Sequence, residues 1–161
     1  MSYTAHMVQH LILAQLVPLM LAALWRVRWR PPAPLAWLIG IAVVIGTSIP
    51  PAYQLARASA MADWIIRAAL VLSGLVFWTP VVGRVRTTRL SPGAALVYAI
   101  TACFSTTLTG IYIAFSATTT DQQVAGLVMW VPCCIIYLTV SLAIVVRAMH
   151  GAGAMASHEV N

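Results

Sequence analysis

The sequence predicts an all-α membrane protein, a polytopic transmembrane helical bundle of about five spans. The first observation is composition: hydrophobic residues make up 61% of the 161 residues and charged residues only 7%. A soluble domain of this length could not cover its surface with so few polar groups. The second observation is a series of apolar segments near the roughly 20 residues that a helix needs to cross a bilayer. The third is the uneven placement of nine basic residues, all of them arginine.

The expected spans follow one another with short connections. The first is apolar until the sequence RVRWR, which is typical of a stop-transfer signal. The second is short and ends before Pro50 and Pro51, and the last ends before Arg147. We expect one transmembrane domain, residues 1–149, and a short polar cytoplasmic tail, residues 150–161. The spans are residues 7–25, 35–49 with some extension, 64–82, 94–115 and 124–146.

The arginines also predict the orientation of the chain. Only Arg57 and Arg67 fall on one side of a chain that crosses five times. Because cytoplasmic loops are enriched in basic residues, this asymmetry predicts a periplasmic N-terminus and a cytoplasmic C-terminus. The net charge of +6 is thereby explained by topology, so we expect lipid around the protein and no nucleic-acid partner. The other seven arginines are Arg26, Arg28, Arg30, Arg84, Arg86, Arg89 and Arg147.

The segment HMVQH, at the start of the first span, contains the leading candidate site. His6 and His10 are one helical turn apart, so their imidazoles share a helix face at about 6 Å, close enough to hold one metal ion. Met7 adds a soft sulfur on an adjacent face. Imidazole with thioether suits copper, Cu(I) in particular, with further ligands from other helices. The alternative is that both histidines are interfacial side chains bonded to backbone or water.

Asp63 and Arg67 form a second polar group at the expected periplasmic end. They are four residues apart, and the acid lies nearer the N-terminus, which is the favourable order for a helical ion pair. An arginine one turn inside the membrane is costly unless it is paired or extends to the surface. The pattern therefore favours a structural salt bridge.

The segment DQQVAGLVMWVP opens the last span and supplies the third polar group. Asp121 is expected to cap the N-terminus of that span, because its carboxylate can accept from unpaired N–H groups. Gln122 and Gln123 are available to neighbouring helices or to a docked partner. Met129 and Trp130 lie deeper, and the proline that follows is expected to kink the helix. The alternative is a capped membrane helix with a proline kink and no further role.

The remaining candidate ligands are three cysteines, Cys103, Cys133 and Cys134, all near the middle of the membrane. An odd number at this depth argues against a disulfide framework. The adjacent pair could hold a soft metal, but buried cysteines usually serve only in packing. The sequence shows neither a nucleophile–base pair nor an acidic proton relay, so we expect no enzymatic activity.

Three motifs in order, AHMVQHLIL, SGLVFWTPVVG and DQQVAGLVMWVP, resemble the CtaG family of cytochrome c oxidase assembly factors. The resemblance spans most of the chain. It implies a bacterial plasma (inner) membrane protein that helps to build a haem-copper oxidase by delivering or guarding copper for its copper B centre. His6, Met7 and His10 match the first histidine motif of the family. Five further residues match its last motif: Asp121, Gln122, Gln123, Met129 and Trp130.

The chain departs from the family pattern at several positions. Members of the family usually carry extra spans before the first histidine motif. They also tend to carry a second histidine pair, at the positions that Asp63 and Arg67 occupy here. Ser48 stands at the position before the proline at the end of the second span, where members of the family often carry a histidine. Cys133 stands where they carry a glycine after MWVP.

Two functions follow from these patterns. In the first, the protein is an assembly factor that handles Cu(I), with His6 and His10 as ligands, Met7 as a candidate third, and Met61, Met129, Cys133 and Cys134 as further candidates. In the second, it is a non-catalytic accessory subunit that stays bound to the haem-copper oxidase subunits, and copper handling has been lost. In that case Asp63, Arg67 and the polar residues of the last motif contact the oxidase.

Overall fold

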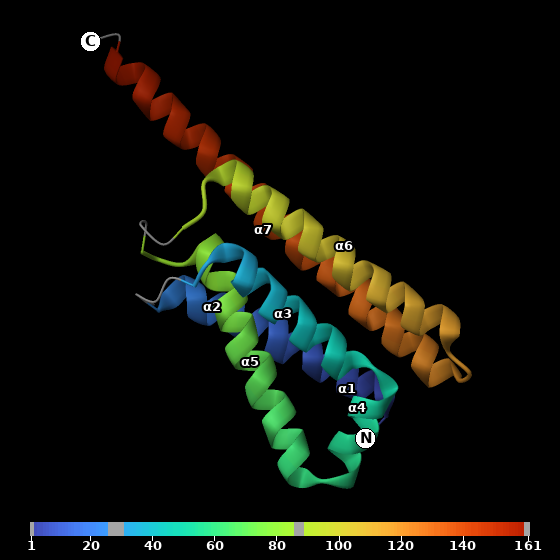
Figure 1. Ribbon diagram of the computed structural model, residues 1–161. Coiled ribbons are helices and arrows are strands. Elements are labelled where there is room, and N and C mark those ends of the chain that lie inside the picture. Colours follow the sequence, from blue (N-terminus) through green and yellow to red (C-terminus); the bar gives the residue numbers. More distant parts are fainter. Residues whose placement is uncertain (1, 26–30, 86–88, 160–161) are drawn as a thin grey trace.

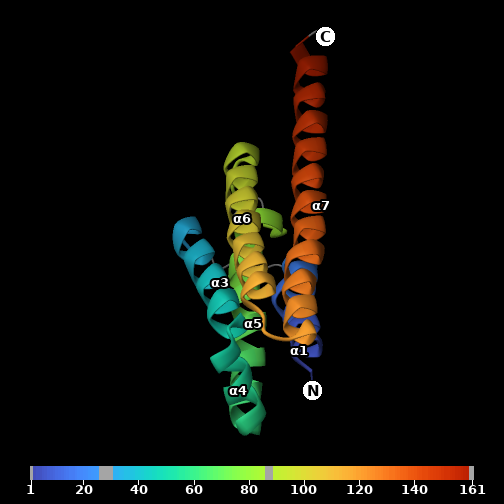
Figure 2. The same cartoon turned by 90° about the vertical axis from the view of Figure 1, so that its right-hand side faces the viewer.

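The computed structural model of the chain describes residues 2–25, 31–85 and 89–159, and all the regular elements in these ranges are helical (Figure 1). The all-α prediction is therefore confirmed. Four helical segments are long and apolar enough to cross a membrane, and a bent pair of helices makes up to five. The described ends of the chain lie at opposite ends of the bundle, as an odd number of crossings requires (Figure 2). The predicted orientation itself remains a prediction.

The first crossing, Tyr3–Leu24, is helical throughout but contains a wide turn. It consists of α1 (Tyr3–Leu11), the π-helical segment η1 (Ile12–Leu16) and α2 (Val17–Leu24). Pro18 explains the wide turn, because it has no N–H to offer the carbonyl of Ala14 and its ring would clash with that carbonyl in a regular helix. The wide turn is seen in the N–H of Val17, which donates to the carbonyl of Ile12, five residues back, rather than to the carbonyl four residues back.

The second crossing differs from its prediction. Its helix, α3 (Ala33–Ser48), is followed after one residue by α4 (Pro50–Ala58), and the two helices are bent by 71°. The expectation of a single span, residues 35–49, missed α4. Pro50 and Pro51 cause the bend: they cannot continue a helix whose N–H groups are needed, but they fit the first turn of a new one. The 16 residues of α3 extend only about 24 Å, less than the hydrocarbon core of about 30 Å.

The last three helices agree with the predicted spans and extend beyond them. They are α5 (Ala60–Val82), α6 (Pro92–Ser116) and α7 (Thr120–Glu159). Helix α7 runs through Pro132 as one continuous element. It also continues beyond the rest of the bundle, into the segment expected to be a polar tail (Figure 1).

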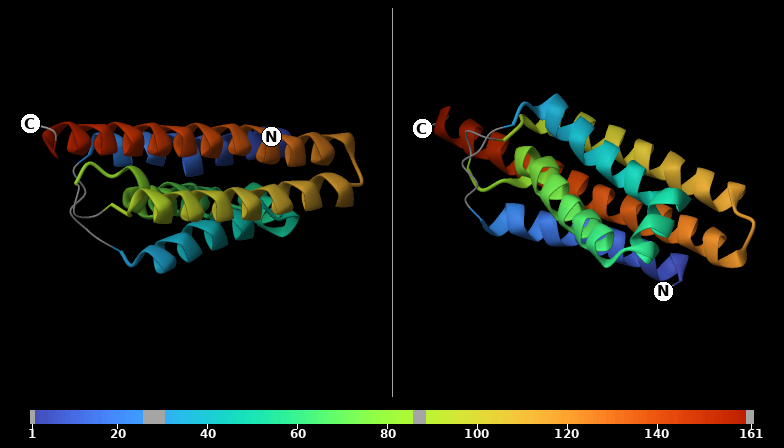
Figure 3. Two further views of the ribbon diagram at one scale, coloured as in Figure 1. Left: turned by 90° about the horizontal axis from the view of Figure 1, so that it is seen from above. Right: turned by 60° about the horizontal axis from the view of Figure 1, so that its bottom comes forward.

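Helices α6 and α7 form an antiparallel pair, and α5 packs against both the first crossing and α3 (Figure 3). Helix α1 packs against α7 and so joins the pair to the rest of the bundle. Gly110 and Gly126 let the backbones of α6 and α7 touch, since a Cβ atom on Gly126 would lie 2.5 Å from the Ala114 nitrogen. Gly74 of α5 has the same role against η1, where its Cβ atom would lie 2.5 Å from the Ala14 oxygen. Small residues at helix crossings are typical of membrane bundles.

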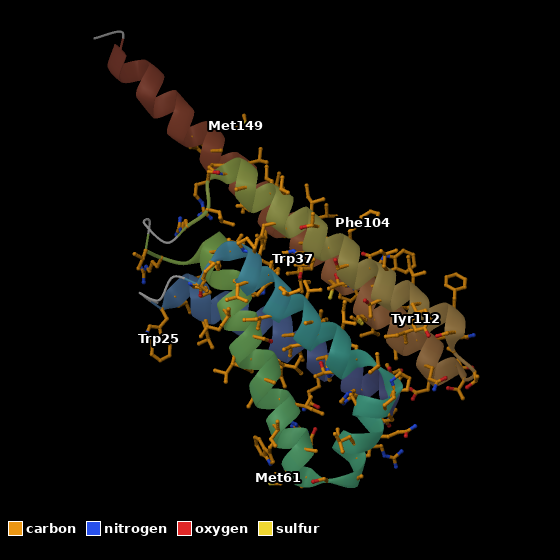
Figure 4. All side chains as sticks on the ribbon, in the orientation of Figure 1. Trp25, Trp37, Met61, Phe104, Tyr112 and Met149 are labelled. Carbon is orange, nitrogen blue, oxygen red and sulfur yellow. The ribbon has the colours of Figure 1, made fainter. Side chains whose placement is uncertain are left out.

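The outer surface of the bundle is apolar, as a lipid environment requires. Large side chains project from several helices (Figure 4), and Met61, Phe104, Tyr112 and Met149 are each exposed by 67–73%. The buried aromatic core lies between α5, α6 and α7. There Trp78 packs against the ring of Tyr137 at a centroid distance of 5.5 Å.

Candidate functional site

The two histidines of HMVQH lie inside the bundle and against each other. His6 and His10, on successive turns of α1, have exposed fractions of 2% and 6%, and their ring centroids are 4.2 Å apart. The predicted juxtaposition on one helix face is therefore present. The alternative, histidines bonded to backbone or water, agrees with the structure at one atom, because a ring nitrogen of His10 bonds to the backbone.

One hydrogen bond defines the chemical state of His10 when its imidazole is neutral. Its Nδ1 lies 3.0 Å from the carbonyl oxygen of His6. A carbonyl can only accept, so Nδ1 carries the proton and Nε2 keeps a free lone pair. Histidines that bind metals commonly donate their other ring N–H to a backbone carbonyl in this way.

The Nε2 atoms of both histidines are buried and have no hydrogen-bond partner. The carbonyl of Thr47, on α3, is close to both rings, but neither Nε2 reaches hydrogen-bond geometry with it. Burying a polar atom without a partner is costly, and such atoms are rare in native proteins. A bound ion or a water molecule would satisfy them.

Two tyrosines flank the histidines. The ring of Tyr53, on α4, lies 5.1 Å from that of His6 and 5.0 Å from that of Tyr3. The hydroxyl of Tyr3 donates to the carbonyl of Ser48 at the end of α3. Helix α4, which the sequence analysis missed, therefore closes one side of the histidine region.

A small cavity adjoins His10 and is rich in sulfur. Its volume is about 10 Å³, close to the minimum for one water molecule or ion. Three of its lining residues carry soft sulfur: Met7 from α1, and Met129 and Cys133 from α7. Gln15, whose buried Oε1 has no hydrogen-bond partner, also lines the cavity. The remaining lining residues are Leu11, Ala14, Val44 and Ser48.

The structure thus separates the candidate sulfur ligands into two classes. Met7, Met129 and Cys133 are 1–5% exposed and lie at the cavity beside His10. Met61 is 73% exposed at the start of α5, so it does not belong to this site (Figure 4). Cys134, next to Cys133 in sequence, instead approaches Cys103 of α6. The predicted vicinal pair is therefore divided between two faces of α7.

Asp121 caps a helix, but a different one from that predicted. Its carboxylate accepts from the N–H groups of Tyr3 at 2.7 Å and Thr4 at 3.2 Å, and from the Thr4 hydroxyl at 2.7 Å. These are the unpaired N–H groups at the start of α1, and the positive end of that helix dipole favours the carboxylate. Figure 2 shows α1 beside the start of α7.

The start of α7 is capped by other residues. The N–H of Gln122 donates to the hydroxyl of Thr119, while the Gln122 side chain accepts from the N–H of Thr118 at 3.0 Å. This arrangement resembles a capping box. Gln122 is therefore engaged within the chain, whereas Gln123 is exposed. Trp130 packs against Gly110 of α6, away from the cavity.

The predicted ion pair is present. Arg67 Nη2 lies 2.5 Å from Asp63 Oδ2, with side-chain exposures of 32% and 22%. The Arg67 guanidinium also lies 5.6 Å from the ring of Trp64, within cation–π range. Both charges lie near enough to interact electrostatically with His6, and Asp121 bonds the start of α1, so the three polar groups, HMVQH, Asp63–Arg67 and Asp121, lie at one end of the bundle.

Across the described residues, no group of three or more His, Cys, Asp or Glu side chains could hold a metal ion. A metal at the histidine pair therefore needs thioether ligands, or ligands from another molecule. The sequence analysis also missed Gln15, whose amide donates to the hydroxyl of Tyr137 at 3.3 Å. A glutamine inside an apolar span was the signal that could have identified it.

These features define a multi-pass membrane helical bundle with a buried histidine pair and soft donors near one end. The profile of one family, described as cytochrome c oxidase caa3 assembly factor, matches residues 1–150. The chain belongs to this family, which supports a role in cytochrome c oxidase assembly. Searches of curated proteins and of solved structures gave no match.

Proposed function

We propose that this assembly factor carries or guards Cu(I) for the copper B centre of a haem-copper oxidase. Copper is the cargo of the protein, held by His6 and His10 with Met7 as a third donor. The observation that supports this role is the pair of buried Nε2 atoms without partners, beside a cavity lined by sulfur. Met129, which lines the same cavity, is a further candidate thioether donor.

The donor set suits a soft monovalent ion. Imidazole and thioether ligands favour Cu(I) over harder cations such as Mg²⁺ and Ca²⁺, which prefer oxygen. The His10 tautomer leaves Nε2 ready to bind without loss of a proton. Neutral ligands leave the positive charge of the ion uncompensated inside the bundle, so binding is reversible, as delivery to an oxidase requires.

The arginine asymmetry supports the location of this site. With a periplasmic N-terminus, the histidine pair lies at the periplasmic end of the first crossing of a bacterial plasma membrane protein. The oxidase subunits that receive copper are then neighbours within the same membrane. Lipid surrounds the remaining apolar surface.

The ion pair favours a second function. Asp63 and Arg67 stand where the family tends to carry another histidine pair, and in this chain they are bonded to each other. A chain without that second pair could serve as a non-catalytic accessory subunit that stays bound to the oxidase. The two functions predict different copper contents for the oxidase when the histidines are replaced.

The test is copper stoichiometry on purified protein with His6→Gln and His10→Gln, which preserve size and hydrogen bonding. Each substitution is expected to lower the Cu(I) affinity by a factor of about ten or more, and to leave the oxidase short of active-site copper. Affinity in the unaltered protein is expected to fall as the pH is lowered, because protons compete for Nε2. His150→Gln, at an exposed histidine of α7, is the matched control and should change neither quantity.

Copper delivery is refuted if both histidine variants co-purify with an oxidase that contains its full complement of copper. That outcome, together with stable association, would establish the accessory-subunit function instead.

A further inference from the structure

Two thiols meet between α6 and α7, outside the histidine site. The Sγ atoms of Cys103 and Cys134 are 3.7 Å apart, and the hydroxyl of Thr107 lies 3.2 Å from the sulfur of Cys134. Both cysteines are free and half-buried, whereas Cys133 is buried and lines the cavity beside His10. Two thiols from different helices in direct contact have the arrangement of a two-thiolate ligand.

We propose that Cys103 and Cys134 form a second soft-metal site, one that binds Cu(I) through sulfur. Metal–thiolate bonds are about 2.3 Å long, so two thiolates at neighbouring corners of a tetrahedral site lie about 3.8 Å apart. The observed separation of 3.7 Å fits this spacing with almost no movement. Both cysteines are free, so both sulfurs are available as ligands.

The packing of α6 against α7 fixes this spacing. Gly110 and Gly126 bring the two backbones into contact about two turns from the thiols, where a Cβ atom on Gly110 would lie 2.9 Å from the Gly126 oxygen. Because the two backbones touch at these glycines, the separation of the helices is fixed there. The thiols are therefore held in register before any metal arrives, which lowers the entropic cost of binding.

Proton release balances the charge of the site. When Cu(I) displaces one proton from the two thiols, the product contains one thiolate, one thiol and one monovalent cation, and is neutral. Loss of the second proton would leave one negative charge, which the low-dielectric surroundings disfavour. The hydroxyl of Thr107 can donate to the Cys134 thiolate and so favours that sulfur as the one that is deprotonated.

The thiols are accessible from the side of the bundle. Cys103 and Cys134 are each only half-buried. A small thiol reagent that partitions into membranes can therefore reach them. This surface differs from the histidine cavity in location and in donor type, so the dithiol site does not depend on the proposed function.

The experiment uses the full chain with His6→Gln and His10→Gln as its parent, under anaerobic reducing conditions. Cu(I) is supplied from a chromophoric chelator, and the parent is expected to withdraw about one equivalent per chain. Cys103→Ala and Cys134→Ala should each weaken this binding by a factor of about ten or more, and in each variant X-ray absorption should show one sulfur neighbour fewer at the copper. Ser105→Ala is the matched control and should match the parent, because Ser105 lies two residues from Cys103 on α6 and its hydroxyl donates to the carbonyl of Thr101 in the same helix.

A second measurement covers variants that fail to fold. Cu(I) added to the parent should protect Cys103 and Cys134 together from N-ethylmaleimide, as read by mass spectrometry. Equal alkylation with and without Cu(I), or parent affinity retained in both alanine variants, overturns the proposal. The histidine site is tested separately in a protein whose Cys103 and Cys134 are both replaced by alanine. If adding His6→Gln and His10→Gln to that protein leaves its Cu(I) affinity unchanged, the histidine site has failed.

Discussion

Gly126→Ala offers a direct test of the contact between α6 and α7. The added Cβ atom would lie 2.5 Å from the nitrogen of Ala114, 2.7 Å from the oxygen of Gly110 and 2.8 Å from the Cα atom of Ala114. Heavy atoms pack at about 3.5 Å, so the helices must separate locally by about 1 Å. All three obstacles are backbone atoms, so no side chain can rotate away to relieve the clash.

The expected cost is that of overpacking, a loss of about 1–3 kcal/mol in the free energy of unfolding. Gly46→Ala is the matched control, because Gly46 lies in α3 with nothing within 4 Å of its added Cβ atom. Alanine is the better helix former by about 1 kcal/mol, so that variant should be as stable as the original protein or more so.

The assay is unfolding in mixed micelles by titration with sodium dodecyl sulfate, followed by circular dichroism. The two variants should differ by about 2 kcal/mol or more, with Gly126→Ala the less stable. Equal stability of Gly126→Ala and the original protein would refute the close crossing. The positions inferred for the thiols beside it would then lose their support.

Three further outcomes are expected. A reporter fused after Asn161 should read as cytoplasmic and one in the loop before Asp121 as periplasmic; the reverse pattern would refute the predicted orientation. Asp63→Ala or Arg67→Ala should each lower stability by about 1–3 kcal/mol, and the double variant by less than the sum, because a single change strands a half-buried charge; additive losses would mean that the two side chains do not interact. Asp121→Ala should speed hydrogen exchange at the amide of Thr4, and unchanged exchange would contradict the cap.

The membrane crossings could be predicted from sequence because apolar length is a local property. The end of α3 was also predictable from Pro50 and Pro51, but the same prolines are a signal for the start of a helix, and that second meaning was missed. Pro18 likewise carried the signal for the wide turn at Ile12–Leu16. In each case the proline could be read from the sequence, and its effect on the neighbouring helical turn determined the structure.

The histidine pair was predictable because helical spacing places positions four residues apart on one face. Met129 and Cys133 share that spacing, so their common position at the cavity had a sequence signal. The partner of Asp121 had none, because it accepts from residues 117 and 118 positions away in the chain. Contacts of that kind depend on how whole helices pack, which no local pattern encodes.

The cap that Asp121 places on α1 has a consequence for biogenesis. The chain emerges N-terminus first, so α1 enters the membrane long before Asp121 is synthesised. Until then the first N–H groups of α1 lack the carboxylate that they bond in the finished protein, and the cavity beside His10 lacks Met129 and Cys133, which line it from α7. A stalled or truncated chain therefore lacks both the cap on its first helix and one wall of this cavity. Insertion of the last helix is the step that completes both.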